Sequence, residues 1–123
     1  MTAMDLVAAA KQQIREVDQT AGCSLLESAL VLDVREPDEF AAGCLPGAVN
    51  IPRGVLEFRI DAHPLFHGRK DARILVYCQS GGRSALAAET LQKLGFSHPL
   101  SLAGGYKAWS EAGLPVTRPA AGL

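Results

Sequence analysis

The segment from residue 74 to residue 84 places an apolar strand directly before a glycine loop and a helix. Its first four residues, 74–77, are apolar and mostly favour β structure, which predicts a strand buried on both faces. Cys78 follows, then a small polar loop with the pair Gly81 and Gly82, and then a helical pattern. A strand that turns into a helix within a few residues is a unit of α/β domains, so this segment restricts the fold more than any other.

The same junction predicts a cradle for an anion. The first backbone N–H groups of a helix have no acceptor inside the helix, and the helix dipole favours negative charge there. We expect Gly81 and Gly82 to adopt backbone conformations that other residues resist, so that the loop turns its N–H groups inward. Such a ring favours the thiolate of Cys78 over the thiol. A buried structural cysteine beside an ordinary glycine turn is the alternative, but the order of strand, cysteine, glycines and helix favours a nucleophile.

Arg83 follows Cys78 after four intervening residues. Phosphatases with a cysteine nucleophile use a loop that is one residue longer, which leaves room to surround a phosphoryl group. The shorter loop fits a single sulfur better than a tetrahedral phosphate. We expect the planar guanidinium of Arg83 to clamp the loop through several hydrogen bonds and to add electrostatic help.

Other predicted strands alternate with short helices along the chain. Strands are expected at residues 14–18, 29–34, 48–51 and 99–102, and helices at 3–14, 21–28, from Pro37 to Gly43, at 55–60, from Ser84 to Leu94 and around Trp109. This alternation predicts an α/β fold with a small, mainly parallel five-stranded sheet and helices on both faces. Ligands of such sheets bind beyond the carboxyl ends of the strands. Cys78, the segment 33–35 and the turn at Gly104 and Gly105 should therefore lie at one edge.

Length and composition predict one domain without a metal or disulfide framework. The 123 residues suit a domain at 14–117, with an N-terminal helical extension at 1–13 and a flexible tail at 118–123. A net charge of −1 and the lack of a basic cluster argue against a nucleic-acid partner. Three cysteines without a CxxC pattern predict neither a zinc site nor paired disulfides, and they suggest a reducing compartment. No signal-peptide or membrane-span pattern is visible, so we expect a cytoplasmic protein with no membrane contact.

Four stretches of the sequence resemble the rhodanese family of sulfurtransferases. They are Cys-Gln-Ser-Gly-Gly-Arg-Ser at 78–84, Leu-Asp-Val-Arg-Glu-Pro-Asp-Glu-Phe at 32–40, Gly-Cys-Leu-Pro-Gly-Ala-Val-Asn-Ile-Pro at 43–52, and Leu-Ala-Gly-Gly-Tyr-Lys-Ala-Trp at 102–109. The resemblance runs from about Val17 to Val116. It implies the rhodanese fold and the transfer of a sulfane sulfur from thiosulfate or a related donor to cyanide or a thiol, without a cofactor. One departure is Cys44, which stands where the family commonly has a histidine and is either a buried filler or a second thiol.

The predicted site has Cys78 as its catalytic residue and no metal. The loop residues expected to bind the substrate anion are Gln79, Ser80, Gly81, Gly82, Arg83 and Ser84. Asp33 and Arg35 are expected to form a structural pair that braces this loop. The hydroxyls of Ser80 and Ser84 either donate hydrogen bonds to a sulfur anion or cap the helix.

Two other functions remain open at the level of sequence. A non-catalytic persulfide carrier or binding module, which passes sulfur to a protein partner, needs the same loop as an enzyme. A phosphatase or arsenate reductase on the same fold is less favoured because of the loop length and because Tyr77 stands where a histidine is expected before the cysteine. His63 and His67 are read as surface residues rather than metal ligands.

Overall fold

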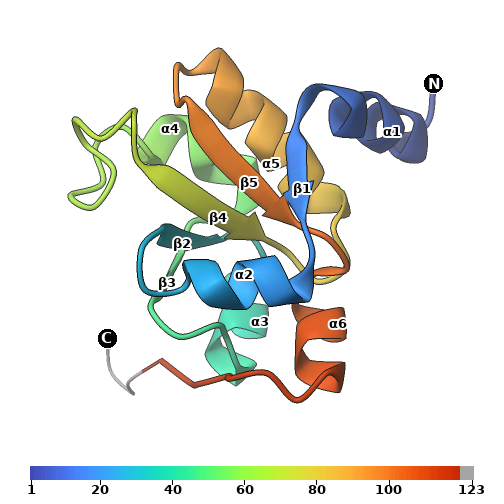
Figure 1. The fold of residues 1–123 in the computed structure, drawn as a ribbon. Coiled ribbons are helices and arrows are strands. Elements are labelled where there is room, and N and C mark those ends of the chain that lie inside the picture. Colours follow the sequence, from blue (N-terminus) through green and yellow to red (C-terminus); the bar gives the residue numbers. More distant parts are fainter. Residues whose placement is uncertain (120–123) are drawn as a thin grey trace.

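The computed structural model describes residues 1–119 and has a five-stranded parallel sheet at its centre (Figure 1). The strand order is β1-β5-β4-β2-β3, and each neighbouring pair is parallel. The strands are β1 (Arg15–Val17), β2 (Leu30–Asp33), β3 (Ala48–Asn50), β4 (Arg73–Tyr77) and β5 (His98–Leu102). The predicted α/β fold with five mainly parallel strands is confirmed. Most of the tail expected to be flexible, residues 120–123, lies outside the described residues.

Helices follow the strands and cover both faces of the sheet. They are α1 (Ala3–Gln13), α2 (Gln19–Leu25), α3 (Pro37–Ala42), α4 (Leu56–Arg59), α5 (Gly82–Lys93) and α6 (Gly105–Glu111), with a 3₁₀ turn, η1 (Arg53–Val55), before α4. The alternation of side chains along a strand divides the core in two. Ile74 and Val76 of β4 pack with α4 and α5, whereas Leu75 and Tyr77 pack with Trp109 of α6 and Leu25 of α2.

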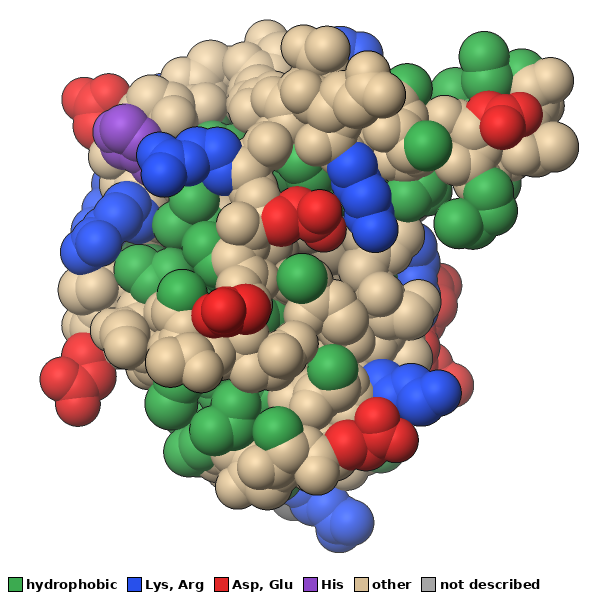
Figure 2. Space-filling model, turned by 45° about the vertical axis from the view of Figure 1, so that its right-hand side comes forward, with side chains coloured by type: hydrophobic (Ala, Val, Ile, Leu, Met, Phe, Trp, Pro, Cys, Tyr) green, Lys and Arg blue, Asp and Glu red, His purple; other side chains and the backbone are tan. Residues whose placement is uncertain are grey.

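The N-terminal helix α1 packs on α5 rather than on the sheet. Val7 and Ala10 are buried against Ala85 of α5, while Met4 stays 70% exposed and Leu6 50% exposed. Figure 2 shows hydrophobic side chains on this projecting helix. Among the described helices, none combines the length and the apolar character needed to cross a membrane.

The carboxyl ends of three central strands lie at the same edge of the sheet. Asp33 ends β2, Tyr77 ends β4 directly before Cys78, and Leu102 ends β5 before the turn that leads to α6. Helix α5 begins at Gly82, two residues before the expected start at Ser84. The expected gathering of Cys78, the segment 33–35 and the turn at 104–105 at this edge is confirmed.

Candidate active site

Cys78 lies between the end of β4 and the first turn of α5, and the residue is only 1% exposed. The backbone N–H of Gly81 donates a hydrogen bond to the Cys78 Sγ at 3.1 Å, and the Ser84 Oγ lies 3.6 Å from the same sulfur. Gly81 has a φ of 111°, in the left-handed region that favours glycine. This conformation lets the chain enter α5 directly after the amide that faces the sulfur.

The first turn of α5 adds to the positive field around the sulfur. The amides of Gly82, Arg83 and Ser84 open the helix, so they have no acceptor within it. Helix α5 has 12 residues, and the positive end of its dipole faces the Cys78 side chain. A backbone donor and the amino end of a helix therefore lie beside this sulfur.

Gly82 does not have the role expected for it. Its φ lies outside the left-handed region, and it forms the first residue of α5. A Cβ at this position would lie 3.7 Å from the Val7 Cγ2, which is an ordinary van der Waals contact. The expectation of an unusual backbone is right for Gly81 and wrong for Gly82, because the loop needs only one left-handed residue to enter the helix.

The start of α6 holds the loop from its other side. The amide of Tyr106 donates to the carbonyl of Cys78 at 2.8 Å, and the amide of Lys107 donates to the carbonyl of Gln79 at 3.0 Å. Gly105 makes this approach possible, because a Cβ there would lie 2.5 Å from the Cys78 carbonyl oxygen and 2.7 Å from the Gln79 carbonyl carbon. The sequence indicated a tight turn at this point but not its contact with the loop.

Asp33 and Arg35 form a buried ion pair beside the loop. The Arg35 Nη2 lies 2.7 Å from the Asp33 Oδ2, and both side chains are at most 2% exposed. Burial by itself would lower the pKa of Arg35, but the hydrogen bonds and charge of Asp33 outweigh it, so this pKa is raised. The guanidinium also donates to the carbonyl of Gly43 at 2.6 Å and to the Gln79 Oε1 at 3.3 Å. Arg35 therefore ties the loop to the segment after α3.

The hydrogen bonds of Arg83 go to Glu39 on α3, not to the loop as expected. Its Nη1 and Nη2 donate to the two carboxylate oxygens of Glu39 at 2.7 and 3.1 Å. These bonds raise the pKa of Arg83 and lower the pKa of Glu39 to about 2. Because the side chain leaves the first turn of α5 toward α3, it links two helices and only indirectly supports the loop.

We expect the Glu39–Arg83 pair to stabilise the fold at neutral pH and to lose this effect in acid. The pKa of Glu39 is about 2 in the folded chain, below the ordinary value of 4.5 that it regains on unfolding, so the unfolded chain takes up a proton first as the pH falls. The stabilisation is complete above about pH 4.5 and declines toward pH 2. Since Arg83 is 37% and Glu39 30% exposed, we expect less than about 1 kcal/mol.

Urea unfolding of the wild type and Glu39→Gln at pH 7 and pH 3 measures this effect. The decrease in the free energy of unfolding caused by Glu39→Gln should be smaller at pH 3 than at pH 7. Glu111→Gln, at the exposed end of α6, is the control and should change little at either pH. An equal loss for Glu39→Gln at both pH values would contradict the assignment.

The other two cysteines lack this environment. Cys44 is 2% exposed, and its backbone pairs with Thr117 in an isolated bridge. Burial, together with the negative charge of Asp33, raises the pKa of its thiol. Cys23 lies on α2 and packs against the core. All three cysteines are free, and only the Cys78 sulfur receives a backbone hydrogen bond within residues 1–119.

Two buried hydroxyls lie behind the sulfur. The Oγ atoms of Ser84 and Ser101 are 2.9 Å apart, and both side chains are fully buried. The Ser84 hydroxyl also donates to the carbonyl of Gly81 at 3.3 Å. Ser101 was not identified from the sequence, and its only signal is a polar residue inside the apolar strand β5. Ser80, in contrast, is exposed. No cluster of three His, Cys, Asp or Glu side chains that could hold a metal occurs in the described part of the chain.

Comparisons with known proteins cover most of the chain. The family model of the rhodanese-like domain matches residues 12–112. A sulfurtransferase from Allochromatium vinosum is 37% identical over 93 residues, which cover 76% of this chain and 82% of that protein. The human thiosulfate:glutathione sulfurtransferase is 36% identical over 99 residues, covering 72% and 86%. A solved structure from Rhodopseudomonas palustris, described as a protein of unknown function and possible tyrosine phosphatase, matches with a TM-score of 0.87, 31% identity and 95% coverage of both chains.

Proposed function

The chain belongs to the rhodanese-like family and is a sulfurtransferase of that family, and from this premise we propose that Cys78 carries the transferred sulfur. The observation that supports this most is the hydrogen bond from the Gly81 amide to the Cys78 Sγ at 3.1 Å, at the positive end of α5. Helix N-termini favour thiolates, and the thiolate is the nucleophilic form of cysteine. No comparable donor reaches Cys23 or Cys44 within residues 1–119.

The proposed reaction has two displacement steps. The Cys78 thiolate attacks the sulfane sulfur of thiosulfate, the sulfur–sulfur bond of the donor breaks, and sulfite leaves with the bonding electron pair. Cys78 then carries a persulfide anion. An acceptor attacks the terminal sulfur, takes it, and returns the electron pair of the broken bond to Cys78 as a thiolate. Both enzyme forms are anions held by the same loop amides, and this covalent cycle predicts ping-pong kinetics.

Thiosulfate and a low-molecular-weight thiol are the donor and acceptor that we propose, with cyanide as the acceptor in assays. The human relative is named for thiosulfate and glutathione, which supports this choice. The 1% exposure of Cys78 also favours a compact donor that can bring one sulfur atom to the loop. We further propose a reducing, cytoplasmic environment, since an odd number of cysteines without a CxxC pattern favours one.

Steady-state formation of thiocyanate from thiosulfate and cyanide tests this proposal. Parallel lines in double-reciprocal plots are expected for the two-step cycle. A carrier that serves one protein partner would instead form the persulfide once and turn over slowly with small acceptors. The outcome of a single stoichiometric transfer without turnover would therefore favour the carrier.

A phosphatase or arsenate reductase is not favoured by this site. Four residues separate Cys78 from Arg83, and the Arg83 guanidinium is engaged with Glu39 instead of turning into the loop. The description of the Rhodopseudomonas palustris protein as a possible phosphatase applies to that protein. We expect no hydrolysis of an aryl phosphate under conditions in which thiosulfate is turned over.

Ser84→Ala should slow sulfur transfer while leaving the fold intact. The Cys78 thiol donates to the Ser84 Oγ at 3.6 Å, and once Cys78 is a thiolate the Ser84 hydroxyl can turn from the Gly81 carbonyl to donate to the sulfur anion. Removing a hydrogen bond to a charged group raises the activation barrier enough to lower kcat/KM about tenfold. Ser80→Ala is the matched control, since this loop serine is exposed, and it should keep nearly full activity. Equal activities of the two variants would contradict a role for the buried hydroxyl.

A further inference from the structure

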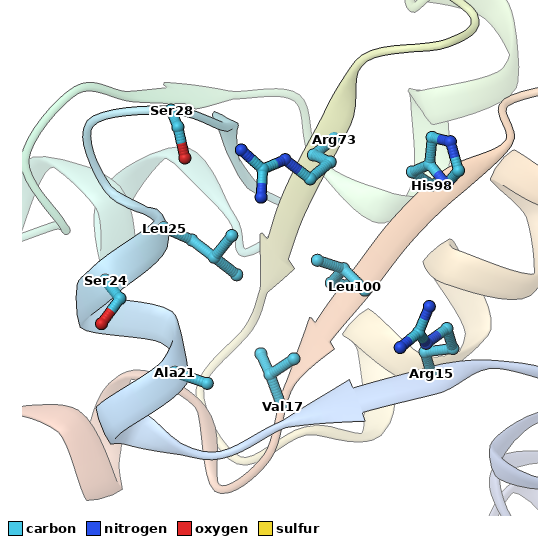
Figure 3. Close-up of a pocket in the computed structure, with 9 residues that line it drawn as sticks. All are labelled: Arg15, Val17, Ala21, Ser24, Leu25, Ser28, Arg73, His98 and Leu100. Atoms are coloured by element: carbon cyan, nitrogen blue, oxygen red, sulfur yellow. The ribbon is translucent and has the colours of Figure 1, made fainter.

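A pocket of about 470 Å³ lies over the amino ends of β1, β4 and β5, beside α2 (Figure 3). Arg73 begins β4, and Cys78 directly follows the other end of the same strand. Five residue steps along a strand span about 17 Å, so the pocket is separate from the candidate active site. None of the residues proposed for sulfur transfer lines it.

The strand register explains why basic side chains gather here. Arg73 is paired with His98, and Arg15 is paired with Leu100 on the neighbouring strand. Residues two apart on a strand share a face, so His98 lies on the face of Leu100 and Arg15 on the face of Val17. Basic residues at the starts of three adjacent strands therefore surround the apolar side chain of Leu100.

The apolar part of the pocket is a corner of the sheet at the side of α2. Leu100 forms its floor and is 9% exposed, and Val17 and Leu25 lie beside it. The α2 side contributes Leu25 and the hydroxyls of Ser24 and Ser28. Figure 3 shows Arg73 and Arg15 on opposite sides of Leu100. A ligand in this corner would meet an apolar floor with cationic groups at its borders.

The charges of this pocket have no counterpart among the residues that line it. Arg15, Arg73 and His98 form no ion pair within residues 1–119, and none of the nine lining residues is acidic. Outside the pocket, six basic residues have an acidic partner, whereas Arg59, Arg69 and Lys107 have none within residues 1–119. Arg15 and Arg73 lie on strands that are separated by β5, so an anion over Leu100 would have a guanidinium group on either side of it.

We propose that this pocket binds a small organic anion with an apolar body. Its acidic group, a carboxylate, sulfonate or phosphate, is held by Arg73 and Arg15, whose planar guanidinium groups suit such oxygens. Its apolar body covers Leu100, Val17 and Leu25. Small-molecule sites of this size combine mostly apolar walls with a few polar groups in the same way. The site is independent of the sulfur-transfer function.

Fluorescence titration with 1-anilinonaphthalene-8-sulfonate, an apolar aromatic anion, tests the proposal. We expect saturable binding to the wild type, and a dissociation constant about tenfold higher in Arg73→Gln and in Arg15→Gln, because each removes charge-assisted hydrogen bonds. Arg69→Gln is the matched control: it removes one exposed charge outside the pocket and should bind the probe like the wild type. N-phenyl-1-naphthylamine, which has the same rings without the sulfonate, should bind much more weakly.

Unchanged affinity in both pocket variants, or equally tight binding of the uncharged probe, would overturn the proposal. Thermal unfolding of each variant shows whether the fold is retained, since this probe also binds partly unfolded chains. Sulfur transfer from thiosulfate should be unchanged in both arginine variants. Because this activity is measured separately, failure of the anion site and failure of the proposed function are distinguishable.

Discussion

Cys78→Ser should abolish transfer of sulfur from thiosulfate to cyanide. The hydroxyl that replaces the thiol is neither nucleophilic toward sulfur nor able to carry a persulfide, so no step of the proposed cycle remains. Intact-mass measurement of the wild type after incubation with thiosulfate should find one added sulfur atom, and peptide mapping should place it on the Cys78 peptide. Cyanide should then remove it. The same treatment should add nothing to Cys78→Ser.

Substitution of the other two cysteines is the control. Cys23→Ser and Cys44→Ala should keep most of the activity, because neither sulfur receives a backbone donor from the described residues, and burial raises the pKa of the Cys44 thiol. Alanine is used for Cys44 because this position is buried, and burying a hydroxyl costs more than burying a methyl group. Loss of activity in a folded Cys44→Ala variant would mean that the site uses two thiols, and the mechanism with one cysteine would have to be abandoned.

Gly105→Ala should lower sulfur transfer by about a hundredfold or more, although the residue lies outside the cysteine loop. An added Cβ would meet the backbone of Cys78 and Gln79 at 2.5 and 2.7 Å, and backbone atoms cannot rotate away as a flexible side chain can. The loop or the start of α6 must therefore move, and the hydrogen bonds from Tyr106 and Lys107 to the loop carbonyls would be strained. The measurement is steady-state turnover together with thermal unfolding.

Gly113→Ala is the control that separates the contact of the added Cβ with the loop from the destabilisation that any left-handed alanine causes. Gly113 follows the same helix with a φ of 74°, close to the 59° of Gly105, but a Cβ there would have nothing within 4 Å. Both substitutions should lower the free energy of unfolding by about 1 kcal/mol, because alanine disfavours the left-handed region. Only Gly105→Ala should also lose activity. If both variants lose activity equally, or if neither does, the contact between Gly105 and the loop does not shape the site.

Local patterns in the sequence were enough to predict the sheet and the place of the candidate site. The apolar run before Cys78 and the helical pattern after it depend on neighbours within a few residues, so the sequence predicts β4 and α5 to within two residues of their observed bounds. Parallel strands joined by helices share one carboxyl edge, which is why the segment 33–35 and the turn at 104–105 were expected beside Cys78. The assignment of Cys78 as the catalytic residue remains a prediction that the variants above test.

The tertiary structure alone decided which groups contact the loop and where its charges pair. The guanidinium of Arg83 is hydrogen-bonded to Glu39, and the hydroxyl of Ser84 is hydrogen-bonded to that of Ser101. Each partner belongs to another helix or strand, and its distance along the sequence follows no rule. The need for a left-handed residue falls on Gly81 and not on Gly82, because the direction of β4 relative to α5 determines where the backbone must turn. Arg15, Arg73 and His98 lie far apart in the sequence, and only the parallel register of three strands brings them around Leu100. Sequence patterns report local conformation, whereas these contacts depend on how the elements pack in space.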